Sequence, residues 1–135
     1  LGARAVVHVD ETDPAAAIRA LTDGAGADVC IEAAGRPETA LACFAAVRTA
    51  GTVVFNGEQG PVPLSPSEHF IRRDITAVGA WFYHFSEYPA MLALYRRGLR
   101  LGELITDQFH FTDAADAYAR FAAGHTGKVL LKYAE

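Results

Sequence analysis

The strongest constraint on the fold is a repeated alternation of short apolar runs with segments of helical periodicity. Ala27–Ala34 is one such run, short and mostly apolar, as expected for a strand buried in a parallel sheet. A helical pattern before it places Ile18 and Leu21 on one face, and a second pattern after it contains Phe44 and Val47. Strands separated by helices favour right-handed βαβ units, with helices on both faces of a parallel sheet.

The same alternation of predicted strands and helices extends along most of the chain. We expect helices after Asp13-Pro14, after Gly35-Arg36-Pro37, after a capping box of Ser65 and Glu68, and after the caps Ser86 and Thr112. We expect strands at Arg4–Val9, Ala27–Ala34, Thr52–Phe55, Asp74–Trp81, Leu104–Phe111 and Val129–Tyr133. The alternation breaks after Gly102, so the segment beyond it is expected to pack elsewhere.

Composition narrows the class of protein. The chain has 135 residues, 51% hydrophobic and 21% charged, with a formal net charge of −4 and no basic stripe. Binding to nucleic acid or to an anionic membrane is therefore not expected. Cys30 and Cys43 form no disulfide framework and no Cys-x-x-Cys pair, which indicates reduced thiols in a cytoplasmic protein. No signal peptide is visible, and the start at Leu1 suggests a piece of a longer protein.

Several familiar motifs are absent from the sequence. Gly24-Ala25-Gly26 resembles a phosphate loop, but Val29 stands where the third glycine should be, and the run precedes a strand. The five histidines are scattered without metal-ligand spacing, and no nucleophile elbow or P-loop is present. We therefore predict no catalytic residue and no metal ligand in this chain.

The ends of the predicted strands remain as candidate binding positions. Ligands of open α/β sheets lie outside the carboxyl ends of the strands, which here are Ala34-Gly35-Arg36, Asn56-Gly57-Glu58 and Ala80-Trp81-Phe82. Glycine at two of these ends permits close approach of the backbone to a ligand. From the residues alone, an equally weighted reading is that the glycines only turn the chain.

Read in order, these segments resemble the zinc alcohol dehydrogenase branch of the medium-chain dehydrogenase/reductase superfamily. The resemblance begins at Leu1-Gly2-Ala3 and runs through residues 21–29 and the tract Ile31-Glu32-Ala33-Ala34-Gly35. It continues through Gly51-Thr52-Val53-Val54 with Gly57, Ile75–Gly79, Leu104-Ile105-Thr106, and residues 113–129. Each piece is common in α/β proteins, but the ordered series covers essentially the whole chain.

The resemblance implies roles for individual residues. Ala34 and Arg36, on either side of Gly35, match positions near the adenine and its ribose, and residues 56–58 match a loop on the nicotinamide side, although position 56 is commonly Val in the family. Residues 80–82 match backbone groups that orient the carboxamide, and Lys128 matches a basic position that reaches the pyrophosphate. The predicted cofactor-binding residues are therefore Ala34, Gly35, Arg36, Asn56, Gly57, Glu58, Ala80, Trp81, Phe82 and Lys128.

The resemblance also implies an architecture. We expect an α/β fold in which residues 1–102 form the C-terminal part of a Rossmann-like NAD(P)-binding domain. Residues 103–135 are expected to return to the catalytic domain. In the family the glycine fingerprint, the zinc ligands and the proton relay all precede the position of Leu1, so none is assigned here.

The implied function is hydride transfer by a zinc-dependent alcohol or polyol dehydrogenase that uses NAD or NADP. The chain alone is expected to be inactive. A homo-oligomer is expected through residues 75–85, because the matching strand pairs two subunits in the family. Two alternatives stay open: a zinc-free quinone or enoyl reductase of the same superfamily, and a freestanding nucleotide-binding or assembly module.

Overall fold

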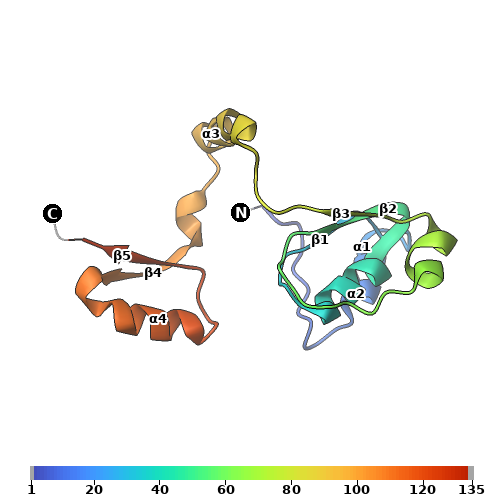
Figure 1. Cartoon of the computed structure of the whole chain (residues 1–135), viewed down its shortest axis with the longest axis horizontal. Coiled ribbons are helices and arrows are strands. Elements are labelled where there is room, and N and C mark those ends of the chain that lie inside the picture. The colour runs from blue at the N-terminus through green and yellow to red at the C-terminus, as the bar shows by residue number, and fades with distance from the viewer. Residues whose placement is uncertain (1, 134–135) are drawn as a thin grey trace. The chain divides into compact units, whose positions relative to one another are not determined.

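The computed structural model describes residues 2–133, which divide into two compact units (Figure 1). Of the described residues, Arg4–Tyr83 form the first unit, and residues 84–133 together with residues 2 and 3 form the second. The predicted boundary between residues 102 and 103 concerns the domains of a longer enzyme and stays a prediction. Within residues 2–133, no helix combines the length and the apolar character that a membrane crossing requires.

The first unit is a three-stranded parallel sheet with two helices. Its elements are α1 (Pro14–Leu21), β1 (Ala27–Glu32), α2 (Pro37–Ala46), β2 (Val47–Phe55) and β3 (Thr76–Gly79). The strand order is β1-β2-β3, and both pairings are parallel. Helix α2 packs against β1 and β2, and α1 packs against α2 (Figure 1). The expected α/β fold, a partial Rossmann-type parallel sheet flanked by helices, is confirmed.

The helix starts follow from local chemistry. Asp13 caps α1, and its Oδ1 accepts a hydrogen bond of 3.1 Å from the N–H of Ala15. Both helices have proline in the first turn, where its missing N–H is not needed (Pro14 and Pro37). The capping box expected at Ser65 is wrong, because Ser65 makes no side-chain cap. Glu68 instead forms an ion pair of 2.5 Å with Arg72, beyond the short π-helical turn Pro66–Phe70.

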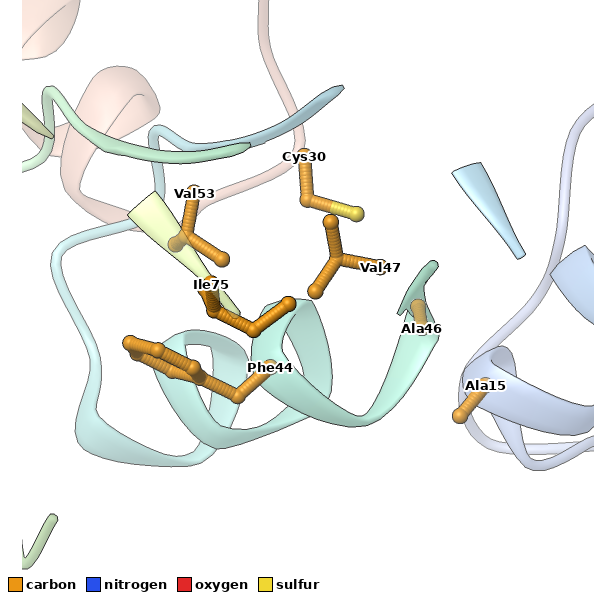
Figure 2. Packing of buried hydrophobic residues seen from close by; sticks show 7 residues of the cluster. All are labelled: Ala15, Cys30, Phe44, Ala46, Val47, Val53 and Ile75. Atoms are coloured by element: carbon orange, nitrogen blue, oxygen red, sulfur yellow. The ribbon is translucent and has the colours of Figure 1, made fainter. Parts of the chain in front are cut away.

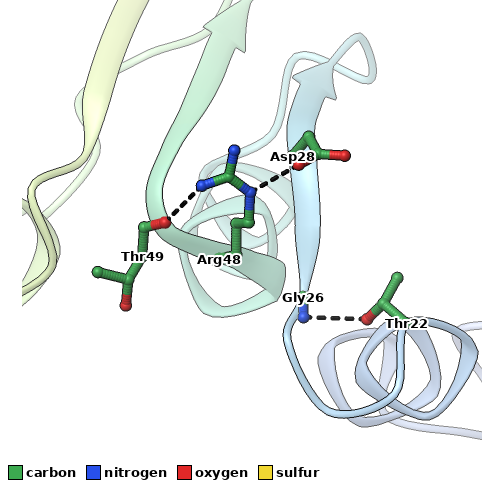
Figure 3. A network of polar contacts seen from close by, with 5 residues as sticks. All are labelled: Thr22, Gly26, Asp28, Arg48 and Thr49. Carbon is green, nitrogen blue, oxygen red and sulfur yellow. Dashed lines mark hydrogen bonds and ion pairs between the residues drawn. The ribbon is translucent and has the colours of Figure 1, made fainter.

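Strand β2 begins earlier than expected, at Val47 rather than at Thr52. Ala27 pairs with Val47, whereas Val29 already pairs with Thr52, so the residues between Val47 and Thr52 bulge out of the ladder. Ala50, within this bulge, has a left-handed φ of 55°. Arg48 is anchored there by hydrogen bonds to the Asp28 carboxylate (2.6 Å) and to its neighbour's carbonyl (Figure 3).

The core of the first unit lies between the sheet and α2. Its buried members are Ala15, Cys30, Phe44, Ala46, Val47, Val53 and Ile75 (Figure 2). Phe44 contacts the ring of Phe70 edge-on, with centroids 5.1 Å apart. Arg73 donates to the carbonyls of Phe44 and Val47, at the end of α2 and the start of β2. The bond to Phe44 satisfies a carbonyl that the end of α2 leaves without a helical partner.

The strand expected at Arg4–Val9 is wrong. These residues form no strand, and Val6 and Val9 are 75% and 67% exposed. A strand needs a partner for its backbone groups, and the sheet contains only β1, β2 and β3. Val29 and Ile31, on the face of β1 opposite Cys30 and Glu32, are also exposed.

The second unit contains two helices and a two-stranded sheet. Its elements are the 3₁₀ turn Phe85–Glu87, α3 (Tyr88–Arg96), the 3₁₀ turn Leu101–Leu104, β4 (Ile105–His110), the 3₁₀ turn Phe111–Asp113, α4 (Ala114–Ala122) and β5 (Lys128–Lys132). Strands β4 and β5 are parallel, and α4 packs against both. Arg120 of α4 donates to the Asp107 carboxylate of β4 at 3.0 Å.

Both helix starts of the second unit differ from the expected caps. His84, rather than Ser86, forms a capping box with Glu87, and the His84 N–H donates to the Glu87 carboxylate at 2.7 Å. His110, rather than Thr112, caps the turn before α4. In each case a short 3₁₀ turn precedes the α-helix, which moves the cap towards the N-terminus.

Candidate functional site

The carboxyl ends of three strands lie side by side in the first unit. Because β1, β2 and β3 are parallel and adjacent, the segments that follow Glu32, Phe55 and Gly79 emerge at one edge of the sheet. Asn56, which follows β2, bonds to the ends of both neighbouring strands. Its N–H donates to the carbonyl of Glu32 at 2.9 Å, and its side-chain Nδ2 donates to the carbonyl of Ala80 at 3.0 Å. The geometry expected for a ligand edge of an α/β sheet is therefore present.

Glu32 organises the first two of these ends. Its side chain is 1% exposed. Oε1 accepts hydrogen bonds from the backbone N–H groups of Ala34 and Gly35 (both 2.9 Å) and from the hydroxyl of Thr39 (2.6 Å). Oε2 accepts from the Gln59 amide at 3.0 Å. One buried carboxylate thus holds the turn after β1, the first turn of α2 and the loop after β2.

These hydrogen bonds keep Glu32 ionised although it is buried. Burial by itself raises the pKa of Glu32, because a low-dielectric surrounding disfavours the charged form. Hydrogen bonds from the Thr39 hydroxyl and from backbone N–H groups of the following turn outweigh that effect, and they hold the pKa below its usual value. The charge therefore contributes to the shape of this edge through its bonds to Ala34, Gly35, Thr39 and Gln59.

Two glycines allow the first two ends to come together. Gly35 has a left-handed φ of 70°, and a Cβ on it would lie 2.5 Å from the carbonyl oxygen of Glu58. A Cβ on Gly57 would collide with the backbone N of Gly35 and would lie 2.6 Å from Oε2 of Glu32. The backbones of the two turns are therefore in direct contact, which only glycine permits.

A groove of about 450 Å³ opens beside the second and third ends. It is lined by Phe55, Asn56, Gly57, Glu58, Gln59, Gly79, Ala80 and Trp81. Trp81 is 67% exposed, and its ring meets that of Phe82 edge-on at 5.1 Å. The groove combines backbone groups, an amide and an aromatic face, which are groups that can contact a small planar, polar ligand.

The structure brings most of the predicted cofactor-binding residues together. Residues 34–36, 56–58 and 80–82 all follow the carboxyl ends of adjacent strands. Asn56, Gly57, Glu58, Ala80 and Trp81 border the groove. Lys128 lies at the start of β5 in the second unit, so it is not placed with the others. Cofactor binding by these ten residues stays a prediction.

The described side chains also bear on whether this chain could hold the zinc ion that the family resemblance implies. Within residues 2–133, no group of three or more His, Cys, Asp or Glu side chains is arranged to hold a metal ion. The described residues therefore do not fit a zinc site, and no step of the chemistry is assigned to a metal held by this chain.

Glu32, Thr39 and Gln59 were not predicted as site residues. The sequence does contain a signal for the first: Glu32 is the lone acid at the end of an apolar strand, in the tract Ile31-Glu32-Ala33-Ala34-Gly35. A charged side chain at a buried strand position needs compensating donors nearby. No comparable signal marks Thr39 or Gln59, which are ordinary polar residues in a helix and a loop.

Comparisons with known proteins agree with this architecture. The family model described as zinc-binding dehydrogenase matches residues 1–97. The chain is 28% identical over 135 residues to an L-threonine 3-dehydrogenase of Symbiobacterium thermophilum, covering 97% of this chain and 38% of that protein. It is 28% identical over 123 residues to the sorbitol dehydrogenase of Bacillus subtilis, with coverage of 89% and 34%.

A solved structure of an alcohol dehydrogenase has the same fold over nearly the whole of this chain. The alcohol dehydrogenase of Thermotoga maritima superposes with a TM-score of 0.80 at 26% identity, over 95% of this chain and 36% of that protein. The chain thus spans between a third and two fifths of the length of these relatives. The ordered resemblance seen in the sequence is confirmed, and the chain belongs to the zinc-binding dehydrogenase family.

Proposed function

We propose that the protein to which this chain belongs is a zinc-dependent, NAD(P)-linked dehydrogenase of secondary alcohols or polyols. The supporting observation is that three parallel strand ends emerge at one edge of the sheet, where the second and third border a groove lined by Asn56, Gly57 and Trp81 among others. The names of the L-threonine 3-dehydrogenase and the sorbitol dehydrogenase support an alcohol or polyol as the substrate class. In this proposal the chain supplies part of the cofactor cradle.

The chain's own residues have positioning roles in this proposal. A bound nicotinamide would supply the hydride acceptor, and the residues that would hold it are those bordering the groove. Glu32 fixes the turn that ends at Gly35, and Gly57 keeps the next turn close to it. Asn56 holds the carbonyl of Ala80 in place, so the backbone of residues 80–82 has a defined orientation. Such preorganisation lowers the entropy cost of binding the cofactor.

The activity is tested on the complete protein. It should reduce NAD or NADP in the presence of a secondary alcohol or polyol, and a strong chelator should abolish turnover. Turnover that survives complete removal of zinc would move the assignment to the zinc-free reductases. Specific nucleotide binding without any turnover across such substrates would favour a binding or assembly module.

The proposed cofactor edge is the edge of the sheet where the carboxyl ends of β1, β2 and β3 emerge. Its role is tested by the substitution Asn56→Ala. Loss of the 3.0 Å bond to the Ala80 carbonyl should raise KM for the cofactor several-fold and change KM for the alcohol little. Glu11→Ala is the matched control, because Glu11 is exposed and lies outside the groove. Equal kinetic constants for Asn56→Ala and the control would argue against a cofactor role for this edge.

We also propose that copies of the protein associate through residues 75–85. Strand β3 is an edge strand in the described sheet, and it pairs only with β2. Within the first unit, Val78, Trp81, Phe82 and Tyr83 are between 47% and 74% exposed, whereas Ile75 belongs to the core. Phe85, which follows in the second unit, is 96% exposed. An open strand edge beside exposed aromatic residues favours pairing with a second chain.

A further inference from the structure

The structure brings together the only two cysteines of the chain, which sequence spacing leaves thirteen positions apart. Cys30 lies in β1 and Cys43 in α2, and α2 packs against β1. Both thiols are free, and both residues border one groove. A pair of adjacent thiols has chemistry that a single buried cysteine lacks.

Both thiols also face the same opening. They line a mostly apolar groove of about 380 Å³, together with Ile18, Val29, Ile31 and Ala46 among others. Cys30 is 8% exposed and Cys43 is half-buried, so a small neutral molecule can reach the pair through the groove. Hydrogen peroxide is such a molecule, whereas bulky thiol reagents would reach Cys43 first.

The surroundings give the two sulfurs different characters. A hydrogen bond from Cys43 and the positive charge of Arg73 lower the pKa of Cys30, although burial acts in the opposite direction. The same hydrogen bond and burial raise the pKa of Cys43. Thiolate is the reactive form of cysteine, so the lowered pKa favours attack by Cys30. Cys43 borders the same groove and is the second thiol of the pair.

We infer that Cys30 and Cys43 form a redox-active dithiol, which hydrogen peroxide converts into an intrachain disulfide between β1 and α2. The Cys30 sulfur attacks one peroxide oxygen, the O–O bond breaks, and hydroxide leaves and is protonated to water. Cys30 is then a sulfenic acid. The Cys43 sulfur attacks it, the S–O bond breaks, and the oxygen departs as a second water with the remaining proton. Two thiols are oxidised, and one peroxide is reduced to two waters.

The test uses the complete chain and hydrogen peroxide. The protein is oxidised under native conditions, remaining thiols are blocked with N-ethylmaleimide, and the product is digested with a protease that cleaves after glutamate. Cleavage at Glu32 and Glu38 separates the two cysteines, whereas trypsin leaves them in one peptide because Pro37 follows Arg36. We expect loss of both thiols together and a linked pair of peptides that dithiothreitol releases.

Three comparisons make the test decisive. Cys30→Ser and Cys43→Ser should each prevent the linkage and leave one thiol open to alkylation or to sulfinic acid. The same oxidation in urea should form the linkage more slowly, because unfolding separates α2 from β1. The inference is overturned if peroxide gives only sulfinic acids, only linkages between different chains, or a linkage that forms equally fast in urea.

Discussion

The carboxylate of Glu32 accepts a hydrogen bond of 2.6 Å from the hydroxyl of Thr39. This bond joins the end of β1 to the first turn of α2, and the same carboxylate oxygen also receives the N–H groups of Ala34 and Gly35. The shape of the proposed cofactor edge therefore depends on a single buried charge. Substitutions of Glu32 should therefore lower the free energy of unfolding as well as impair the proposed function.

Removing this carboxylate should destabilise the fold. Glu32→Ala leaves the Thr39 hydroxyl, the Gln59 amide and two backbone N–H groups without their acceptor, so we expect a loss of about 2–4 kcal/mol. Thr39→Val should cost about 1 kcal/mol. Urea denaturation measures both. The double variant should lose less than the sum, since the two residues share a bond.

Glu32→Gln removes the charge but keeps one acceptor oxygen, and an amide NH2 group replaces the other oxygen. The side-chain oxygen of Gln59 is buried without a hydrogen-bond partner. A glutamine amide at position 32 can donate to that oxygen once Gln59 reverses its amide. We therefore expect Glu32→Gln to be more stable than Glu32→Ala. Equal losses for the two variants would contradict the assignment of the network.

The contribution of Glu32 should depend on pH with a defined sign. Its folded pKa is lowered, so the stability it confers is complete above the unfolded pKa, about 4.3, and is lost as pH falls through the folded pKa. The difference in unfolding free energy between wild type and Glu32→Gln should therefore shrink on acidification. Hydrogen bonds from Thr106 and Arg120 also lower the pKa of Asp107, but both proteins share this effect. A difference that grew on acidification would mean that the folded pKa of Glu32 is raised instead.

The contact between the two glycine turns predicts a steric effect. Gly57→Ala places a Cβ against the backbone of Gly35 and 2.6 Å from the Glu32 carboxylate, so we expect a loss of about 1–3 kcal/mol. Gly60→Ala is the matched control, because no atom lies within 4 Å of the position its added methyl group would take, and its φ is not left-handed. The control should change stability by less than about 0.5 kcal/mol. Thermal denaturation of the pair gives the comparison.

The framework of the first unit could be predicted from the sequence because local signals and tertiary packing agree there. Asp13 and Pro14 start α1, Pro37 starts α2, and the apolar run of β1 forms a buried strand. The start of β2 was missed because residues 45–50 are compatible with helix, and Gly51 resembles a helix stop. Pairing of Val47 with Ala27 overrides that local preference.

The remaining differences between the sequence-based predictions and the structure depend on contacts between residues that are far apart in the sequence. Arg4–Val9 has a strand-like composition, but a strand exists only where its backbone groups find a partner. Glu32 becomes a site residue because Thr39 and Gln59 fold back onto it, seven and twenty-seven positions away. The three strand ends were predicted as candidates, since their meeting follows from parallel topology alone.

The chain by itself should bind the cofactor weakly. Its sequence contains no glycine fingerprint, so the contacts that this motif makes to the pyrophosphate are not available. Charge-assisted hydrogen bonds contribute roughly 1.5–3 kcal/mol each, and the loss of several reduces affinity by orders of magnitude. We expect no dehydrogenase activity and at best roughly millimolar NAD binding from residues 1–135. Calorimetry that gave micromolar affinity would overturn this expectation.

The exposed edge of β3 predicts self-association that a single charge should weaken. Val78 lies on this edge strand and is 47% exposed, so Val78→Lys places a cation where a second chain would pair. Sedimentation velocity should show a wild-type oligomer that dissociates in the variant, together with a red shift of Trp81 emission. Leu21→Lys is the matched control, since Leu21 is 56% exposed at the end of α1 and lies outside residues 75–85. A wild-type monomer at high concentration, with Trp81 emission typical of full exposure, would exclude this interface.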